Sequence, residues 1–401
     1  MRNFPRKERL ALTTLFYSFG FFVMALAPRF PDLKTNLGVT YGTFGTLVGV
    51  GTLGAFTALM TMGHIIHKVG TFPVLFGSTL SMITMFVIVA NTSSPLVFLI
   101  ANVAFGMSWA SYHISVNTQS LHQQKAYGAN VLPFLHGMWT TGAVTTAILA
   151  AIIADFVDFK VHMNIVAAIS AVVLLSTIWW MRPLCIPASE VHDEDGAIGF
   201  VKMIKSFRID WTLSAAYMSV LAVEVAVGDW GALFSRDVLG VSKGNAIYPY
   251  IVFMSAMIIG RVGFQRVMSG RDEIKVVKSF IIYGGILFTG FISLTPVVMD
   301  YSTDLAFTLL LLGLFAGGLG SSFLGPYLFS HTARRSPRPD SVALAELSAT
   351  NTALTFLFKL VIAWIAEAAG LVVALLIPGV LFFIVAFYIK KILVTTSKPA
   401  A

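Results

Sequence analysis

The strongest constraint in this sequence is a series of apolar runs, each about 20 residues long, the length that an α-helix needs to cross a bilayer. Twelve such runs follow one another along the chain. Charged residues make up only 11% of the chain, far below the roughly 25% of a soluble domain. Backbone groups in lipid must find hydrogen bonds within their own segment, so the runs predict helices. The sequence therefore predicts an all-α membrane protein with twelve transmembrane helices.

The runs form two sets of six, separated by the longest polar stretch of the chain, residues 182–209. The first set covers about 11–31, 43–63, 73–90, 95–119, 131–154 and 161–181, and the second covers about 210–234, 246–266, 276–298, 305–327, 342–366 and 370–389. Such a repeat is typical of transporters built from two related halves. We therefore predict a six-helix bundle at 1–181, a cytoplasmic linker at 182–209 and a second bundle at 210–401.

Lys and Arg residues are distributed unequally between the two sides of the predicted membrane. With the N-terminus inside, 21 of the 27 fall on the inner side, five on the outer side, and Lys359 lies within a span. Positive residues accumulate on the cytoplasmic side, so the pattern predicts that both termini are cytoplasmic. The basic residues lie in short loops rather than on one polar domain, so the net charge of +8 does not indicate a nucleic-acid partner.

Ionisable residues inside the runs are the first candidates for function, because a charge in the bilayer is costly unless it is paired. Glu224 lies about fourteen residues into the stretch that starts at Trp211, and Asp229 lies nearer the outer end. We predict that Glu224 couples transport to protons and that His113 is a second titrating group. Lys359 and Asp229 are predicted charge partners. The alternative is that Glu224 itself neutralises Lys359 and never changes protonation.

Polar and aromatic residues follow helical spacing in several runs, and such a face must contact another helix or a water-filled cavity. Tryptophan and tyrosine rings offer stacking surfaces to a solute, and amide or hydroxyl groups offer hydrogen bonds. The predicted substrate-binding residues are Asn102, Trp109, Tyr112, Asn117, His136, Trp139, Trp230, Asn351 and Thr355. The alternative is that the Asn and Thr residues only bond to neighbouring helices.

Several classes of protein lack support in the sequence. We find no nucleotide-binding loop, no metal-ligand spacing and no nucleophile motif. The single cysteine, Cys185, excludes an intrachain disulfide and a cysteine-based metal site. We therefore predict a secondary transporter that is not an enzyme and has no cofactor and no metal.

Two loops resemble the signature of the major facilitator superfamily, which has glycines, an acid and basic residues between the second and third spans. Gly63, Lys68 and Gly70 match in the first half, with His67 in place of the acid. Arg261 and Arg266 occupy the corresponding loop of the second half. The resemblance implies a gating role for these five matching residues and a fold of two six-helix bundles.

Narrower motifs are similar to a bacterial branch near the fucose-permease-type sugar transporters. They read HISVN from His113, LHGMWTTGA from Leu135, and EVAVGDWGA from Glu224. His113 stands where the branch has an aspartate, so the coupling scheme of the fucose permeases does not carry over. The resemblance implies a secondary transporter of the bacterial inner membrane that moves a small polar organic solute, such as a sugar, by alternating access as a monomer. The position of Glu224 adds the prediction that transport is proton-coupled symport. The alternative is an efflux transporter for drugs or amphipathic metabolites.

Overall fold

The computed structural model describes residues 5–128, 131–188, 207–268, 270–322, 324–325, 327–328 and 340–394. These residues are mostly helical and contain no β-strand. The chain divides into two compact units, Met1–Val39 with Leu47–Ser206 and Thr40–Thr46 with Phe207–Ala401. The first turn of one helix, α3, therefore belongs with the second unit, although the rest of α3 belongs with the first.

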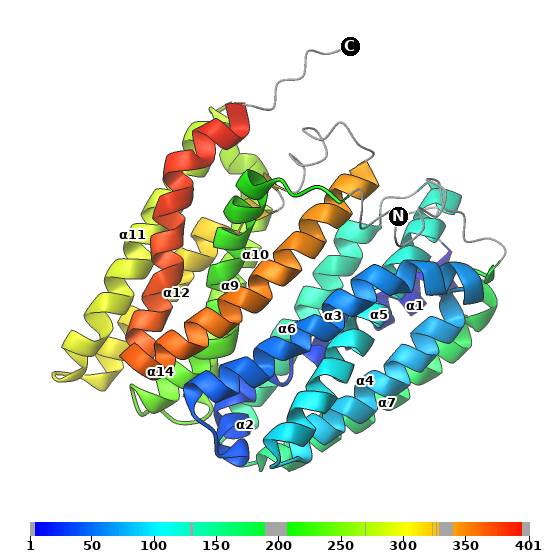
Figure 1. Cartoon of the computed structure of the whole chain (residues 1–401), viewed down its shortest axis with the longest axis horizontal. Helices are drawn as coiled ribbons and strands as arrows, with labels where there is room; N and C mark the ends of the chain where they lie inside the picture. The colour runs from blue at the N-terminus through cyan, green and yellow to red at the C-terminus, as the bar shows by residue number, and fades with distance from the viewer. Residues whose placement is uncertain are drawn as a thin grey trace. The chain divides into compact units, whose positions relative to one another are not determined.

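The first unit contains seven α-helices within its described residues (Figure 1). They are α1 (Arg6–Val23), α2 (Phe30–Leu37), α3 (Tyr41–Val69), α4 (Thr71–Asn91), α5 (Pro95–Tyr127), α6 (Leu132–Ile153) and α7 (Phe159–Met181). Helix α1 packs against α6 and α7, and α4 packs against α5 and α7. Short 3-10 helices, η1 (Ala27–Arg29) and η2 (Arg182–Leu184), follow α1 and α7.

The first predicted span, 11–31, is interrupted where α1 ends. Pro28 and Pro31 lie in the first turns of η1 and α2, where proline is tolerated because those amides have no intrahelical partner. Arg29 is buried at this break. Its Nε donates to Asp32 Oδ2 at 2.6 Å, and its Nη1 donates to His162 Nδ1 of α7 at 3.1 Å. This network ties the break to α7.

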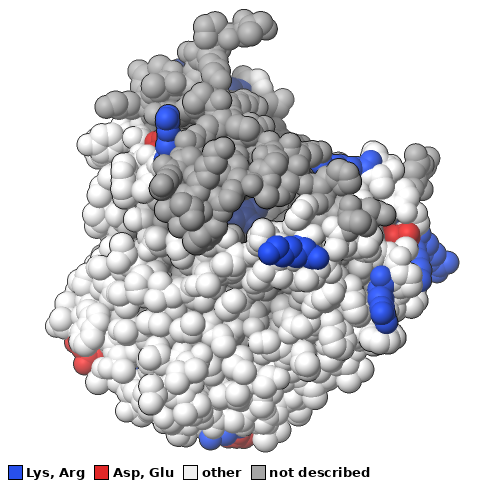
Figure 2. Space-filling view, turned by 45° about the vertical axis from the view of Figure 1, so that its right-hand side comes forward, with Lys and Arg blue, Asp and Glu red and all other residues white. Residues whose placement is uncertain are grey.

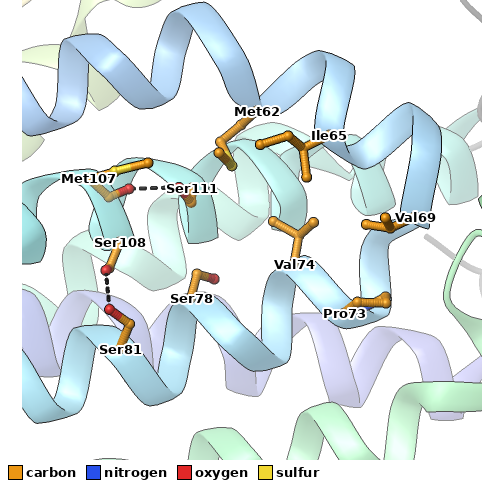
Figure 3. A pocket seen from close by; sticks show the side chains of 10 residues that line it. All are labelled: Met62, Ile65, Val69, Pro73, Val74, Ser78, Ser81, Met107, Ser108 and Ser111. Carbon is orange, nitrogen blue, oxygen red and sulfur yellow. Dashed lines mark hydrogen bonds between the residues drawn. The ribbon is translucent and has the colours of Figure 1, made fainter.

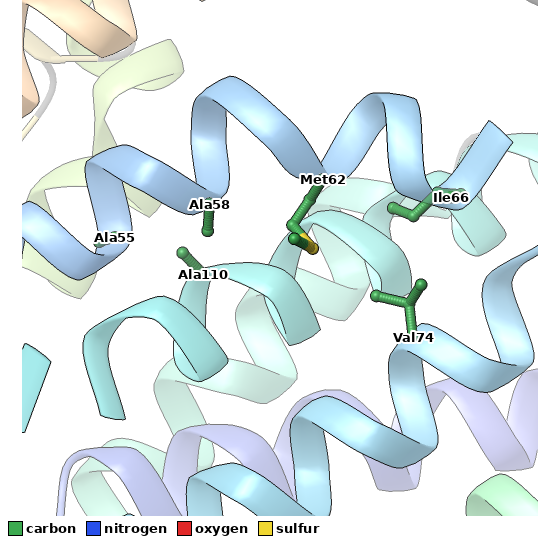
Figure 4. Packing of buried hydrophobic residues seen from close by; sticks show 6 residues of the cluster. All are labelled: Ala55, Ala58, Met62, Ile66, Val74 and Ala110. Atoms are coloured by element: carbon green, nitrogen blue, oxygen red, sulfur yellow. The ribbon is translucent and has the colours of Figure 1, made fainter. Parts of the chain in front are cut away.

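Small residues bring α3 close to α5, and α4 packs against the same cluster. The buried cluster comprises Ala55, Ala58, Met62 and Ile66 of α3, Val74 of α4 and Ala110 of α5 (Figure 4). A side chain on Gly54 would clash with the carbonyl of Val103 on α5. Membrane helices associate through this kind of close van der Waals packing, because lipid supplies no hydrophobic force between them.

The second unit contains five α-helices within its described residues. They are α9 (Trp211–Asp237), α10 (Tyr248–Met268), α11 (Glu273–Met299), α12 (Thr303–Ser321) and α14 (Asp340–Val394), with η4 (Asn245–Ile247) before α10. Helix α9 packs against α14, α11 packs against α12 and α14, and α10 packs against α12. Asp210 caps α9 by accepting hydrogen bonds from the amides of Thr212 and Leu213.

Eleven described segments, rather than the twelve predicted, are long and apolar enough to cross a membrane. The difference arises in α14, whose apolar segment Glu346–Ile389 has 44 residues and covers both of the last two predicted spans. Gly370 interrupts this helix with φ 86° and ψ 163°. Figure 1 shows α14 turning back on itself in two arms, orange and red. The two spans are therefore joined by one non-helical residue instead of a loop.

Many large apolar side chains lie on the surface of both units. Val172, Val262 and Phe387 are each more than 70% exposed. Figure 2 shows a wide area of the described surface without Lys, Arg, Asp or Glu. Soluble monomers seldom expose apolar patches larger than a few hundred Å². This surface suits hydrocarbon rather than water, which agrees with the length of the helices.

The backbone of Gly370 lies in a region that is open almost only to glycine. We expect Gly370→Ala to lower the free energy of unfolding by about 1–3 kcal/mol, because a Cβ atom strains this conformation. The measurement is thermal unfolding of the purified protein in detergent. Gly290→Ala, in helical α11 with no atom within 4 Å of an added Cβ, is the control and should not destabilise. An unchanged midpoint for Gly370→Ala would contradict the assigned backbone.

Candidate functional site

The first unit gathers several predicted site residues on one face of α5. Trp109, His113 and Asn117 are spaced four residues apart, so successive side chains lie one above another on the helix. The rings of Trp109 and His113 stack with centroids 5.9 Å apart and an interplanar angle of 5°. All three side chains are partly exposed. The spacing seen in the sequence thus becomes a continuous polar and aromatic stripe.

Helix α6 adds His136 to this stripe. Its ring lies edge-on to His113, with centroids 6.0 Å apart. Its Nε2 donates to Asn117 Oδ1 at 3.2 Å, since an amide oxygen only accepts. The Asn117 amide nitrogen donates in turn to the carbonyl of His113 at 2.7 Å. His136 is exposed. Two imidazoles, an amide and an indole therefore come together as one cluster, which we call the histidine cluster (Trp109, His113, Asn117 and His136).

Helix α1 contributes two rings that the sequence did not single out. Phe19 lies 6.0 Å from His113 and 6.3 Å from Trp109 between ring centroids, and Phe16 lies 5.5 Å from His136. Their three-residue spacing was the available signal, but apolar rings in a span are usually packing residues. Both phenylalanines are buried. They therefore pack against the histidine cluster on its buried side.

Three other predicted substrate residues of this unit lie outside the histidine cluster. Tyr112 is fully buried, and its hydroxyl donates to the Leu15 carbonyl of α1 at 3.2 Å. The Asn102 amide donates to the Leu47 and Val48 carbonyls of α3 at 2.9 and 3.2 Å. Trp139 on α6 is partly exposed. In this conformation, Tyr112 and Asn102 connect helices.

The second unit holds the acid around which the predicted mechanism is built. Glu224 on α9 is half-buried and makes no hydrogen bond or ion pair with the described part of the chain. Its electrostatic neighbours are Arg261 of α10 and two tyrosines, Tyr217 and Tyr250. The Arg261 Nε donates to the Ser322 carbonyl at 3.0 Å. Arg261, predicted as a gating residue, is thus the cation that acts on Glu224.

Lys359 pairs with Asp229 and not with Glu224. The Lys359 Nζ lies 2.8 Å from Asp229 Oδ2, and the two side chains are 17% and 15% exposed. Helices α14 and α9, which carry the two residues, pack against each other. The sequence offered both acids as partners, and the structure selects Asp229. Lys359 therefore does not neutralise Glu224.

The remaining predicted residues of the second unit are mainly enclosed. Trp230 is 2% exposed, and its indole nitrogen finds no acceptor within the described residues. Asn351 is also buried, with its amide nitrogen bonded to the Leu347 carbonyl and its oxygen unpaired there. Thr355 donates to the sulfur of Met218 at 3.6 Å. Among the described residues, Trp230 and Asn351 thus each keep one buried polar atom without a hydrogen-bond partner.

The predicted gating loop of the first unit is the tight connection between α3 and α4. Gly70 has φ 80°, which favours glycine, and the following amide, of Thr71, donates to the Ile186 carbonyl at 3.0 Å. Gly63 and Lys68 are exposed. The side chain of Arg266, the corresponding residue of the second half, lies outside the described residues. No group of three His, Cys, Asp or Glu that could hold a metal occurs in the described ranges.

Comparison with known proteins identifies the family. The family model of the Major Facilitator Superfamily matches residues 10–338. The chain belongs to the Major Facilitator Superfamily. It is accordingly a multi-pass membrane transporter of the secondary type, and not an enzyme.

Relatives within the superfamily extend along almost the whole chain. An uncharacterised MFS-type transporter of Yersinia pestis is 25% identical over 374 residues, covering 92% of this chain and 91% of its own. The membrane protein MosC of Rhizobium meliloti is 24% identical over 378 residues, covering 92% and 87%. These names give no substrate.

Solved structures show the same fold. A variant of the nucleoside transporter NupG aligns with a TM-score of 0.78 at 14% identity, covering 96% of this chain and 99% of its own. A second NupG structure gives a TM-score of 0.72 at 15% identity, covering 96% and 98%. The predicted superfamily fold is therefore confirmed.

The Lys359–Asp229 pair predicts a measurable coupling. Lys359→Gln leaves Asp229 unpaired at a partly buried site, and we expect it to reduce the free energy of unfolding by about 2 kcal/mol. The double variant Lys359→Gln with Asp229→Asn removes both charges and should recover most of that loss. Thermal unfolding in detergent of the two single variants and the double variant measures the coupling. Additive losses would show that the two residues do not stabilise each other.

Proposed function

We propose that this protein moves a small polar organic solute across the cytoplasmic membrane by proton-coupled alternating access, with Glu224 as the coupling acid. The observation that carries the proposal is the different environment of the two acids on α9. Asp229 has Lys359 at 2.8 Å, whereas Glu224 has no hydrogen bond or ion pair within the described residues. An ion pair with a cation favours the carboxylate over the protonated acid. Glu224 is free to take up a proton.

Opposing influences act on Glu224. Removal from water favours the protonated form of a carboxylic acid, and a nearby cation favours the carboxylate. Arg261 supplies that cation, while its side chain is also held by the Ser322 carbonyl. A change in the distance between Arg261 and Glu224, or in the access of water to them, shifts the balance. Each switch between the two open states of an alternating-access transporter changes the access of water to Glu224. Proton uptake and release by Glu224 would follow these switches.

The histidine cluster supports the proposed class of solute. Trp109 presents an aromatic face, and His136 and Asn117 present polar groups on the same stripe. Rings with polar edges, as in sugars and nucleosides, suit such a combination of stacking and hydrogen bonding. NupG, a nucleoside transporter by its title, shares only the fold at 14% identity. Nucleosides therefore join sugars among the first compounds to test.

The excess of Lys and Arg in alternate loops supports a topology in which both termini are cytoplasmic. We place the protein in the bacterial inner membrane because its relatives are bacterial. We propose that a single copy transports, because each chain contains both units of the fold.

The coupling role of Glu224 can be tested in proteoliposomes. Glu224→Gln keeps the size of the side chain and resembles the protonated acid. We expect it to exchange substrate across the membrane at near wild-type rate but to lose accumulation driven by a pH gradient. Glu367→Gln is the matched control, because Glu367 is exposed and accepts from the Gly42 amide, a bond that glutamine can also accept. Gradient-driven uptake by Glu224→Gln would exclude the proposed coupling.

The role of Trp109 can be tested by substrate affinity. Loss of one stacking surface typically weakens binding by about 1 kcal/mol, so we expect Trp109→Ala to raise KM roughly fivefold or more. Trp109→Phe should restore part of the affinity. Trp211→Ala, at an exposed tryptophan of the other unit, is the control and should leave KM unchanged. Equal KM values for Trp109→Ala and wild type would show that the histidine cluster is not part of the binding site.

A further inference from the structure

A groove of about 350 Å³ lies in the first unit between α3 and α4, with α5 as its floor (Figure 3). Its rim carries Ile65 and Val69 of α3 and Met107 of α5, all more than a third exposed. These residues belong to helices that cross the membrane. The medium at such a rim is lipid hydrocarbon, so the groove opens to acyl chains. Its volume is within the range of small-ligand sites.

The polar groups of the groove are already satisfied within the protein. Ser78 donates to the Leu75 carbonyl, Ser108 to the Ala104 carbonyl and Ser111 to the Met107 carbonyl. The hydroxyls of Ser81 and Ser108 lie 2.7 Å apart, as the dashed line in Figure 3 shows. A buried water needs two to four polar partners, and no hydroxyl here has an unused proton to offer. An apolar occupant fits the groove better than water.

An empty groove of this size would leave its lining without contacts, which is unfavourable in a close-packed membrane protein. The flexible acyl chain of a bilayer lipid can fill such a space. The acyl chain that fills the groove comes from the hydrocarbon of the bilayer, so van der Waals contacts with the lining, rather than removal from water, stabilise its binding.

A basic residue lies next in the chain to Val69, one of the residues that line the groove. Lys68 is exposed, lies next to Val69 in the last turn of α3, and makes no ion pair with the described part of the chain. The inner leaflet of the membrane is rich in anionic lipids, and each surface Lys or Arg attracts them by about 1 kcal/mol. The cation and the apolar groove thus match the two ends of one lipid molecule.

We propose that the groove between α3 and α4 binds one acyl chain of an anionic phospholipid whose head group contacts Lys68. The site is separate from the proposed substrate site but shares α5 with it. Ser108 and Ser111 line the groove, whereas Trp109 and His113 lie on the stripe of the histidine cluster. A bound chain therefore supports α5 at the back of that stripe.

Native mass spectrometry of the full chain in detergent tests the site, with dioleoyl-phosphatidylglycerol or dioleoyl-phosphatidylcholine added at equal concentrations. Ser78→Leu puts a larger side chain into the groove and takes the place of part of the acyl chain, so the chain loses contacts with the lining and phosphatidylglycerol should bind about tenfold more weakly. Ser176→Leu on α7 is the matched control, because Ser176 is exposed and bonds to Val173 at the same 3.2 Å that separates Ser78 from Leu75. It should bind lipid like wild type.

The head-group contact is tested separately. Lys68→Gln should reduce the preference for phosphatidylglycerol over phosphatidylcholine about fivefold. If Ser78→Leu lowers the yield of folded protein, Val69→Trp is the second variant. Val69 lies at the exposed rim, so a tryptophan there blocks the opening of the groove and excludes the acyl chain. Equal lipid affinity in Ser78→Leu, Val69→Trp and Ser176→Leu would overturn the site. A preference that is unchanged in Lys68→Gln would overturn the head-group contact.

Discussion

An ionised side chain in hydrocarbon needs an opposite charge, a hydrogen-bond partner or a proton, and this requirement shapes the second unit. Helix α9 carries two acids five residues apart, Glu224 and Asp229. Asp229 meets the requirement with Lys359, which ties α9 to α14. Glu224 meets it only through the more distant influence of Arg261. The same helix therefore combines a fixed pair with an acid whose state can change.

The first unit uses neutral polar groups in place of ion pairs. Asn102 connects α5 to α3, Tyr112 connects α5 to α1, and Asn117 connects α5 to α6. Each of these bonds has one partner on α5, so α5 is the helix that connects the three neighbours through hydrogen bonds. Neutral hydrogen bonds in membrane proteins are worth only about 0.6 kcal/mol on average. Such a helix can shift relative to its partners without exposing a charge to lipid.

Much of the architecture could be predicted from the sequence, because hydropathy and helix length are set by the bilayer. The positions of Glu224, Trp109 and His113 in their spans followed from counting residues. The junction at Gly370 could not be predicted as such, since both flanking runs are apolar and no polar loop marks the boundary. The partner of Lys359 could not be chosen either, because spacing along α9 does not give its rotation against α14. Phe16 and Phe19 were missed because a ring that supports a site has the same sequence signature as one that only packs.

The junction at Gly370 affects how this protein can be handled in the laboratory. The two arms of α14 meet at one residue, so the chain there offers no loop for a protease to cut or for an epitope to replace. Reporter insertion between these two spans would have to extend the backbone at the single non-helical residue that joins two helical arms. Mapping of sidedness is better served by the connection between α9 and α10, where Ser242 and Lys243 lie outside any helix. A tag at that point would leave both flanking helices intact.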